Sequence, residues 1–262
     1  MQELLNQNIK DIIGRFPEVE KVLSQYEIAC VSCNVGTCRL RDIMEIHNLT
    51  EQEEQSVMKR IAREVYPDRE IPIPRISRKP TSAGIHYSPP IKKLVNEHVL
   101  IKRLLALIPA LIEEIRKDAG HAGPMVEASI DFIRSYADKF HHAKEEEVLF
   151  RYFDENAEII KSMHKEHEIA RAHVKSIQEA LIKPDHQAVI EHLREYRDLL
   201  GEHIKKEDEI LYPWMDRNLS TSQVGNLFTS FASIDAEFGD VPKEKEDFIL
   251  ELERIFEPKQ GS

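Results

Sequence analysis

Beyond residue 89, apolar residues recur every three or four positions over long stretches, which is the spacing of one face of an α-helix. The pattern is interrupted at Gly120 to Pro124, around Asp154 and at Pro184. Four consecutive helices are therefore predicted, over residues 90–118, 124–153, 155–182 and 185–217. Helices of about 30 residues joined by short turns are typical of an up-down four-helix bundle.

Shorter helices are predicted on both sides of this bundle. Toward the N-terminus, residues Asn8 to Tyr66 contain several short apolar repeats, with Pro17 opening one helix and Thr50-Glu-Gln-Glu53 capping another. Past the bundle, Ser220-Thr-Ser-Gln223 is a second capping pattern, and a last helix is expected from about Lys243 to Phe256. We expect these last helices to pack outside the bundle.

The segment from Pro67 to Pro90 contains six prolines and no apolar periodicity, which is typical of an extended, semi-rigid linker. We therefore expect a small helical domain that contains the cysteines at 1–66, a proline-rich linker at 67–88, and the bundle with its C-terminal extension at 89–258. The predicted fold class is all-α.

Composition and charge narrow the function. The chain has 262 residues, 41% of them hydrophobic and only 9 of them glycine, which suits a helical globular protein. A formal net charge of -11 and the lack of a basic stripe argue against nucleic acid or anionic lipid as a partner. No leader-like segment and no run of about 18 apolar residues is visible, so a cytoplasmic protein without a membrane anchor is expected.

Two segments repeat one chemical pattern, in which a histidine precedes a glutamate by four residues and an aliphatic pair and an aromatic residue follow. The first copy contains His141 and Glu145, and the second contains His203 and Glu207. Residues four apart lie on one face of an α-helix, so each copy directs an imidazole and a carboxylate to the same point. Helical bundles build di-iron sites in this way.

Helical phase tests which histidines face the bundle interior, at about 100° per residue. His98, His167 and His203 each lie on the apolar stripe of their helix. In the second helix, His141 and Glu145 align with Ile130, Ala137, Val148 and Tyr152, whereas His142 and Glu146 align with Ser135, Asp138 and Lys139. Phase therefore favours the pair at 141 and 145.

The predicted metal ligands come from all four bundle helices: His98, His141, Glu145, His167, His203 and Glu207. Imidazole and carboxylate ligands suit iron, manganese or zinc. A single histidine on an apolar stripe is more often an ordinary core residue, and a single histidine–glutamate pair is more often on the surface. The combination favours a metal pair, because two buried glutamates would be costly without a cation.

From about Pro89 to Trp214 the chain resembles hemerythrin-like domains. The resemblance rests on Glu97-His98, on His141 with Glu145, on His164-Lys-Glu-His167-Glu168, and on His203 with Glu207 and the Ile-Leu-Tyr-Pro that follows. It implies a helical bundle with two iron ions in an oxo- and carboxylate-bridged centre that binds dioxygen, nitric oxide or peroxide. Glu145 and Glu207 would bridge the irons, and the four histidines would be terminal ligands.

The chain is more similar to the four-histidine, two-glutamate proteins of iron-centre repair than to the respiratory carriers. The carriers have a fifth histidine where this chain has Met163, and an aspartate where it has Glu207. His164, the neighbour of Met163, is a candidate fifth ligand, and whether His164 or His142 joins the site stays open. Fewer protein ligands leave open iron positions, which favours sensing or chemistry over simple oxygen carriage.

The three cysteines lie close together as Cys30, Cys33 and Cys38. An odd count is a poor disulfide framework, but a Cys-x-x-Cys pair exchanges as a dithiol or binds metal, with His47 as a further candidate ligand. Residues 5 to 65 are similar to a small helical domain family that recurs beside hemerythrin-like domains. A redox or second metal role and simple buried thiols both remain open.

The leading expectation is a di-iron protein that binds a small ligand in stress response, sensing or iron homeostasis. A di-iron oxidoreductase, such as a peroxidase or nitric oxide reductase, is one alternative, and an iron-centre repair protein is another. A metal-responsive interaction module is a further alternative, because metal binding couples to folding. A helical scaffold without metal is the simplest reading. The electron donor, the protein partner and the oligomeric state are not predicted.

Overall fold

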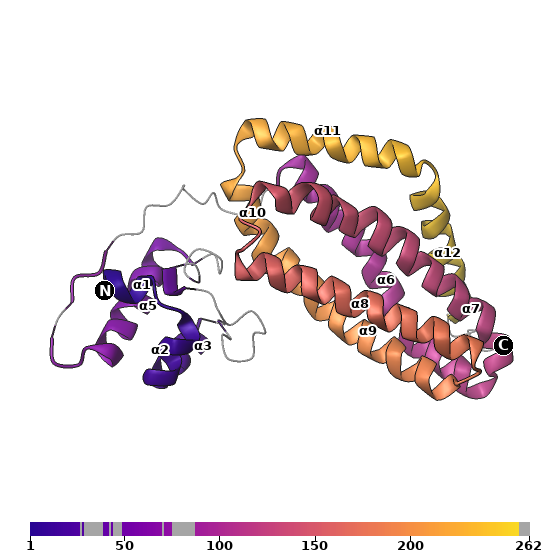
Figure 1. Cartoon of the computed structure of the whole chain (residues 1–262), viewed down its shortest axis with the longest axis horizontal. Coiled ribbons are helices and arrows are strands. Elements are labelled where there is room, and N and C mark those ends of the chain that lie inside the picture. Colours follow the sequence, from indigo (N-terminus) through magenta and orange to yellow (C-terminus); the bar gives the residue numbers. More distant parts are fainter. Residues whose placement is uncertain are drawn as a thin grey trace, which may run out of the picture. The chain divides into compact units, whose positions relative to one another are not determined.

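In the computed structural model, helices make up most of the part of the chain that is described (Figure 1). The structure describes residues 1–26, 28, 39–41, 43, 49–69, 71–74 and 87–256. Within these ranges there is no β-strand, only an isolated bridge between Asn8 and Arg39. The predicted all-α class with a four-helix bundle is confirmed. Among the described helices, we find no candidate for a membrane-spanning segment.

The chain divides into two compact units. The first comprises Met1–His86, Asn156–Ser162 and Glu209–Asn218, and the second comprises Tyr87–Glu155, Met163–Asp208 and Leu219–Ser262. Cys30, Cys33, Cys38 and His47 lie outside the described residues, as does most of the predicted linker.

In the N-terminal region, short helices surround an apolar core. They are α1 (Gln2–Leu5), α2 (Ile9–Arg15), α3 (Glu18–Ser24) and α5 (Glu51–Val65). The capping box predicted at Thr50 and Glu53 begins α5. Each side chain of this pair accepts a hydrogen bond from the other residue's backbone N–H, which satisfies two donors that the helix start leaves open. The fully buried Ile12, Leu23 and Ile61 belong to the core.

The four bundle helices are the following: α6 (Pro89–Lys117); a second helix made of α7 (Ala119–Phe132), η1 (Ile133–His142), η2 (Glu145–Leu149) and η3 (Phe150–Tyr152); α8 (Glu158–Ile182); and α9 (His186–Lys206), continued by η4 (Glu207–Leu211) and α10 (Tyr212–Asn218). The predicted break at Gly120 to Pro124 is wrong. The second helix begins at Ala119, because the Asp118 side chain accepts a hydrogen bond from the backbone N–H of His121 and caps it there.

Three parts of the bundle helices are π-helical: η1, η2 and η4. A π-turn pairs residue i with residue i+5, so each residue turns by less than the about 100° of an α-helix. These wider turns lie at the predicted ligands, since η1 ends at His142, η2 starts at Glu145 and η4 starts at Glu207. The assumption of uniform α-helical phase therefore fails here.

Two more helices pack against α6 and the second bundle helix, as Figure 1 shows: α11 (Thr221–Phe238) and α12 (Val241–Phe256). The predicted capping box at Ser220 and Gln223 begins α11. Gly239 ends it with a φ of 53°, a conformation that suits glycine. Ile249 and Leu252 of α12 join the apolar core of the bundle, so the C-terminal extension belongs to the same unit.

Candidate metal centre

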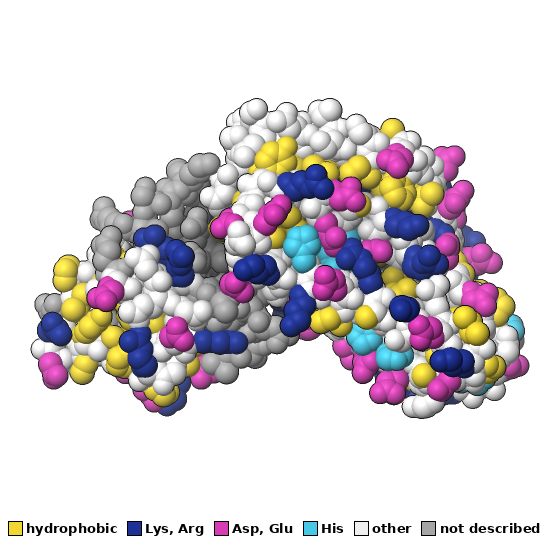
Figure 2. All heavy atoms as spheres, viewed as in Figure 1, with side chains coloured by type: hydrophobic (Ala, Val, Ile, Leu, Met, Phe, Trp, Pro, Cys, Tyr) yellow, Lys and Arg dark blue, Asp and Glu magenta, His cyan; other side chains and the backbone are white. Residues whose placement is uncertain are grey.

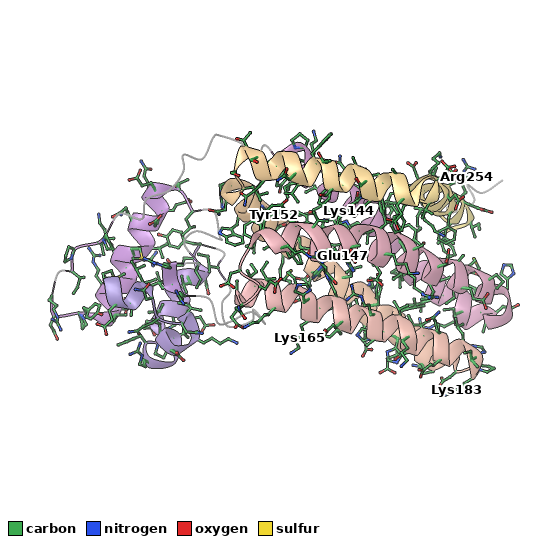
Figure 3. The ribbon with its side chains drawn as sticks, turned by 45° about the horizontal axis from the view of Figure 1, so that its top comes forward. Lys144, Glu147, Tyr152, Lys165, Lys183 and Arg254 are labelled. Atoms are coloured by element: carbon green, nitrogen blue, oxygen red, sulfur yellow. The ribbon has the colours of Figure 1, made fainter. Side chains whose placement is uncertain are left out.

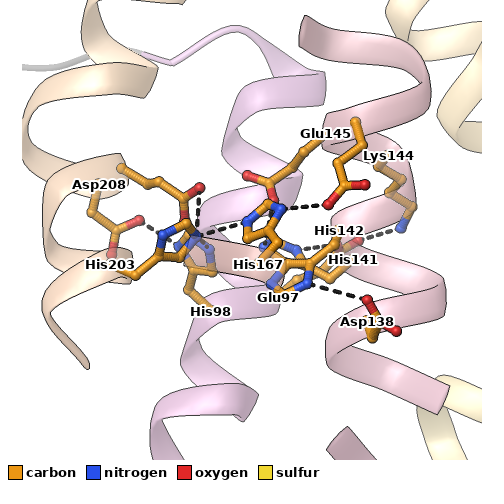
Figure 4. Close-up of polar contacts among 12 residues, drawn as sticks. Glu97, His98, Asp138, His141, His142, Lys144, Glu145, His167, His203 and Asp208 are labelled. Atoms are coloured by element: carbon orange, nitrogen blue, oxygen red, sulfur yellow. Dashed lines mark hydrogen bonds and ion pairs between the residues drawn. The ribbon is translucent and has the colours of Figure 1, made fainter. Parts of the chain in front are cut away.

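The six residues predicted as ligands converge in the interior of the bundle (Figure 4). His98 comes from α6, His167 from α8 and His203 from α9, and the others come from the π-helical segments. Each of the six is at most 1% exposed. A seventh residue, His142, is 3% exposed and lies among them. We refer to these seven residues as the buried centre.

The buried centre consists of two groups of potential ligands that share one carboxylate. The ligand atoms within each group lie within 4.8 Å of one another. The two groups are His98, His141, Glu145 and Glu207, and His142, Glu145, His167 and His203. Two adjacent groups with a common glutamate are the arrangement that a pair of metal ions requires.

Both glutamates reach imidazoles of the two groups. One oxygen of Glu207 lies 3.0 Å from Nε2 of His203, and the other lies 3.3 Å from Nε2 of His98. Oε2 of Glu145 lies 3.6 Å from Nε2 of His167 and 3.9 Å from Nε2 of His141. Ligand atoms about 2.0–2.2 Å from a common ion are separated by roughly these distances. Each glutamate therefore lies within the spacing of metal ligands from two imidazoles of different helices.

His142 corrects the phase argument, which had turned this residue away from the interior. Its ring stacks on that of His167, with centroids 3.8 Å apart and an interplanar angle of 12°. Because η1 is π-helical up to His142, consecutive histidines both face inward. His164 is half-buried, its ring contacts the edge of Phe150, and neither group includes it.

A carboxylate lies beside Nδ1 of every histidine in the buried centre. The Nε2 atoms of four of these histidines face Glu145 or Glu207: His98, His141, His167 and His203. The contacts are His98 to Asp208 (2.7 Å), His141 to Glu97 (3.0 Å), His167 to Glu146 (2.6 Å), His203 to Glu166 (2.8 Å) and His142 to Asp138 (3.6 Å). Such carboxylates fix the tautomer and orientation of metal-binding imidazoles and increase their basicity.

Each of these carboxylates in turn pairs with a cation. The pairs are Asp208 with Lys102, Glu97 with Lys144, Glu166 with Lys206, and both Glu146 and Asp138 with Arg171. Figure 3 shows Lys144 between the second bundle helix and α11, where it also lies 2.9 Å from Asp235. The cations offset the negative charge of so many buried carboxylates, which would otherwise be costly.

The sequence argument did not find these acids. Asp208 and His98 are 110 positions apart, so no local spacing connects them. A signal did exist, because Glu97, Glu146, Glu166 and Asp208 each adjoin a predicted ligand in the sequence. The partner of each of these four acids is nevertheless an imidazole of another helix, which only the fold brings into place. Asp138 instead lies four residues before its partner His142.

The pKa values show how the charges balance without a metal. Burial, together with His98, lowers the pKa of His141 to about 4. Burial also opposes the charged form of His203, but Glu207 and Glu166 raise its pKa to about 9. Burial likewise acts to raise the pKa of Glu207, yet His203 and His98 hold it well below its ordinary range. The carboxylate is thus ionised, and a metal would displace the proton of His203.

The donor set fits a pair of transition-metal ions. It combines imidazole nitrogens and carboxylate oxygens, which iron, manganese and zinc accept. Nε2 of His141 is buried and has no hydrogen-bond partner among the described residues, although burial of such an atom is unfavourable. A cation between the two groups would satisfy this nitrogen and neutralise the glutamates.

A cavity of about 230 Å³ reaches the buried centre. Its lining includes His142, Tyr196, Ala137, Ala170, Val174 and Arg171. It lies between the second bundle helix and α8, with Tyr196 contributed by α9. Pockets for drug-sized organic ligands usually measure about 300–1,000 Å³. This cavity is thus better suited to a small ligand.

Comparison with known proteins agrees with this geometry. Residues 89–215 match the family model described as the Hemerythrin HHE cation binding domain. No curated protein and no solved structure matches the chain.

Proposed function

We propose that the hemerythrin-like domain formed by residues 89–215 holds two iron ions and binds dioxygen, nitric oxide or peroxide at their open coordination positions. The observation that carries this proposal is the pair of ligand groups that share Glu145. His98 and His141 would hold one iron, and His142, His167 and His203 would hold the other. Glu145 and Glu207 would bridge the two ions.

The number of ligands supports a reactive centre. Five imidazole nitrogens and four carboxylate oxygens supply no more than about nine ligand atoms. Two octahedral ions take about twelve. The difference leaves positions for an external ligand, and more of them on the iron with two histidines. When bound, two irons supply Lewis acidity and electrons to such a ligand.

The size and lining of the cavity favour a small ligand. It meets the buried centre at His142, and its other walls include Ala137, Ala170 and Val174. A diatomic molecule or peroxide is similar in size to a water molecule, which takes about 30 Å³ in the liquid. These apolar side chains suit such a molecule, and the charged Asp138 and Arg171 make the rest of the lining partly polar.

The protein's own groups hold the centre in one geometry. The carboxylates that pair with Nδ1 of His98, His141, His167 and His203 fix these four imidazoles, so the rings need little reorganisation when iron binds or changes its charge. Arg171 connects two of these carboxylates, Asp138 and Glu146, and also lines the cavity. Arg171 would therefore both support the histidines and add positive charge on the route of an anionic ligand.

The test begins with protein purified anaerobically from cells grown with iron. We expect two irons per chain and a new charge-transfer absorption band on addition of air, nitric oxide or peroxide. Zero or one metal per chain would contradict the di-iron proposal. Two zinc or manganese ions per chain would support a site for two metals but would contradict its assignment to iron.

Kinetics then separate binding from turnover. A stable adduct, with stoichiometric uptake of the ligand, supports a binding or sensing protein. Steady consumption of peroxide or nitric oxide in the presence of a reductant would instead identify an oxidoreductase. Restoration of damaged iron centres in another protein would identify the repair function. If helicity changes strongly with iron and no small ligand binds, the protein is a metal-responsive module.

A further inference from the structure

A second cluster of metal-binding side chains lies away from the buried centre, on the hairpin of α8 and α9. It consists of His173 on α8 and of His192 and Glu195 on α9, and we refer to it as the surface triad. His173 is six residues from His167, or about 9 Å along the helix. Figure 2 shows histidine side chains exposed over α8 and α9, with acidic side chains beside them.

The three donor atoms of the surface triad form a nearly equilateral triangle. Nδ1 of His173 lies 3.3 Å from Nδ1 of His192, and Oε2 of Glu195 lies 3.3 Å and 3.1 Å from the same two nitrogens. Ligands about 2.0–2.1 Å from one ion are separated by about 2.9 Å in an octahedron and about 3.4 Å in a tetrahedron. The observed spacings fall between these two values.

We propose that the surface triad is a separate binding site for a divalent transition-metal ion, which joins α8 to α9. Two imidazoles and one carboxylate suit zinc or copper, whereas calcium and magnesium require more oxygen ligands. Three protein ligands leave at least one position for water. The side chains are 18%, 30% and 47% exposed for His173, His192 and Glu195, so the ion exchanges with solvent.

An ordinary surface contact between histidine and glutamate does not explain the whole arrangement. Such a contact requires one imidazole beside one carboxylate, whereas here two Nδ1 atoms also face each other at 3.3 Å. A shared ion satisfies all three donor atoms at once.

This site is independent of the proposed di-iron function. Its expected role is structural, because the three ligands come from two helices joined by the short turn at 183–185. A metal that binds only the folded state across this hairpin stabilises that state by an amount that grows with the logarithm of the free metal concentration above the Kd. Zinc would therefore raise the melting temperature of the iron-loaded protein.

The experiment uses the iron-loaded full chain with its thiols alkylated, so that Cys30, Cys33 and Cys38 do not bind the added metal. The protein is dialysed against buffered Zn²⁺, and zinc and iron are counted together. We expect one zinc per chain with the iron content unchanged. We expect His192→Asn to lose this zinc, and Glu195→Gln to weaken its binding at least about tenfold.

The matched control is His186→Asn, which changes an exposed histidine at the start of α9 and should retain the zinc. Circular dichroism and iron content show whether each variant is folded. Zinc should raise the melting temperature of the unsubstituted protein and of the control, but not that of His192→Asn. Absence of zinc beyond the iron sites, or zinc that persists in both His192→Asn and His173→Asn, would overturn the proposal.

Discussion

The buried centre and the surface triad use the same kinds of ligand in opposite surroundings. In the buried centre every imidazole is at most 3% exposed and has a carboxylate beside its Nδ1. In the surface triad the Nδ1 atoms themselves face the proposed ion, and the side chains are 18% to 47% exposed. The buried centre is thus oriented before metal binds, whereas the surface triad is not.

This difference predicts different binding strengths for similar chemistry. Fixing a side chain in advance removes much of the entropy that is lost when a ligand binds. Low exposure strengthens electrostatic attraction and also makes the empty site costly. We therefore expect the buried centre to retain its metals through dialysis and the surface triad to exchange its metal with buffer.

The largest expected effect is that of Glu145→Ala, because both ligand groups include this carboxylate. We expect the iron content of the purified protein to fall from two per chain to nearly none. Glu147→Ala, two residues away on the exposed side of the same helix, is the control and should keep both irons. Metal analysis of the two variants is the measurement, and two irons in Glu145→Ala would show that this residue is not a bridge.

The sequence predicted the fold and most of the buried centre because these depend on local patterns. Apolar spacing located the bundle helices, and two capping boxes marked the start of α5 and α11. The six predicted ligands meet in one interior because each lies on an apolar stripe. A stripe reports only which side of a helix is buried, and that is sufficient for residues aimed at a bundle axis.

The rest depends on features that apolar spacing does not encode. Phase favoured His141 over His142 and left the place of His142 open, because a π-helical segment changes the angle between successive residues without changing the sequence pattern. Four of the acids beside the imidazoles were missed because each contact joins two helices, whereas Asp138 lies four residues before His142 in the same helix. The surface triad is likewise formed by two helices, and His173 has no partner in its own sequence neighbourhood.

The next effect tests the correction at His142. We expect His142→Ala to reduce the iron content to about one per chain, because this ring belongs to only one of the two ligand groups. His164→Ala, which changes a half-buried histidine outside both groups, should keep two irons. If iron is lost only from His164→Ala, His142 is not a ligand, as the α-helical phase predicted, and His164 is the fifth histidine.

A smaller effect is expected at the carboxylate beside His98. It tests how much a carboxylate that orients a metal-binding imidazole adds to the affinity for iron. Asp208→Asn keeps the size of the side chain but removes the charge that faces Nδ1 of His98. Loss of such a partner typically weakens metal binding by about 10–100-fold. Competition with a chelator measures this change. Asp198→Asn, at a 65% exposed position on α9, is the control and should bind iron unchanged.

The smallest expected effect comes from a polar contact that needs no metal. Its contribution to the free energy of unfolding can be compared with the contribution of zinc at the surface triad. Two hydrogen bonds of 2.7 Å, donated by the guanidinium of Arg103 to Glu253, join α6 to α12. Both side chains are about one-third exposed, so solvent screens the pair. We expect Glu253→Gln to lower the free energy of unfolding by about 0.5 kcal/mol.

The pH dependence of this effect has a definite sign. The hydrogen bond from Arg103 lowers the pKa of Glu253, so the folded state favours the ionised form. The stabilisation is therefore complete above the unfolded pKa, about 4.3, and is lost as the pH falls through the lower folded value. Urea unfolding of both proteins at pH 7 and pH 3 measures this. The loss of unfolding free energy in Glu253→Gln at pH 7 is then compared with the gain that zinc gives the unsubstituted protein. If the loss is much the larger, the surface triad contributes less to stability than an ordinary ion pair.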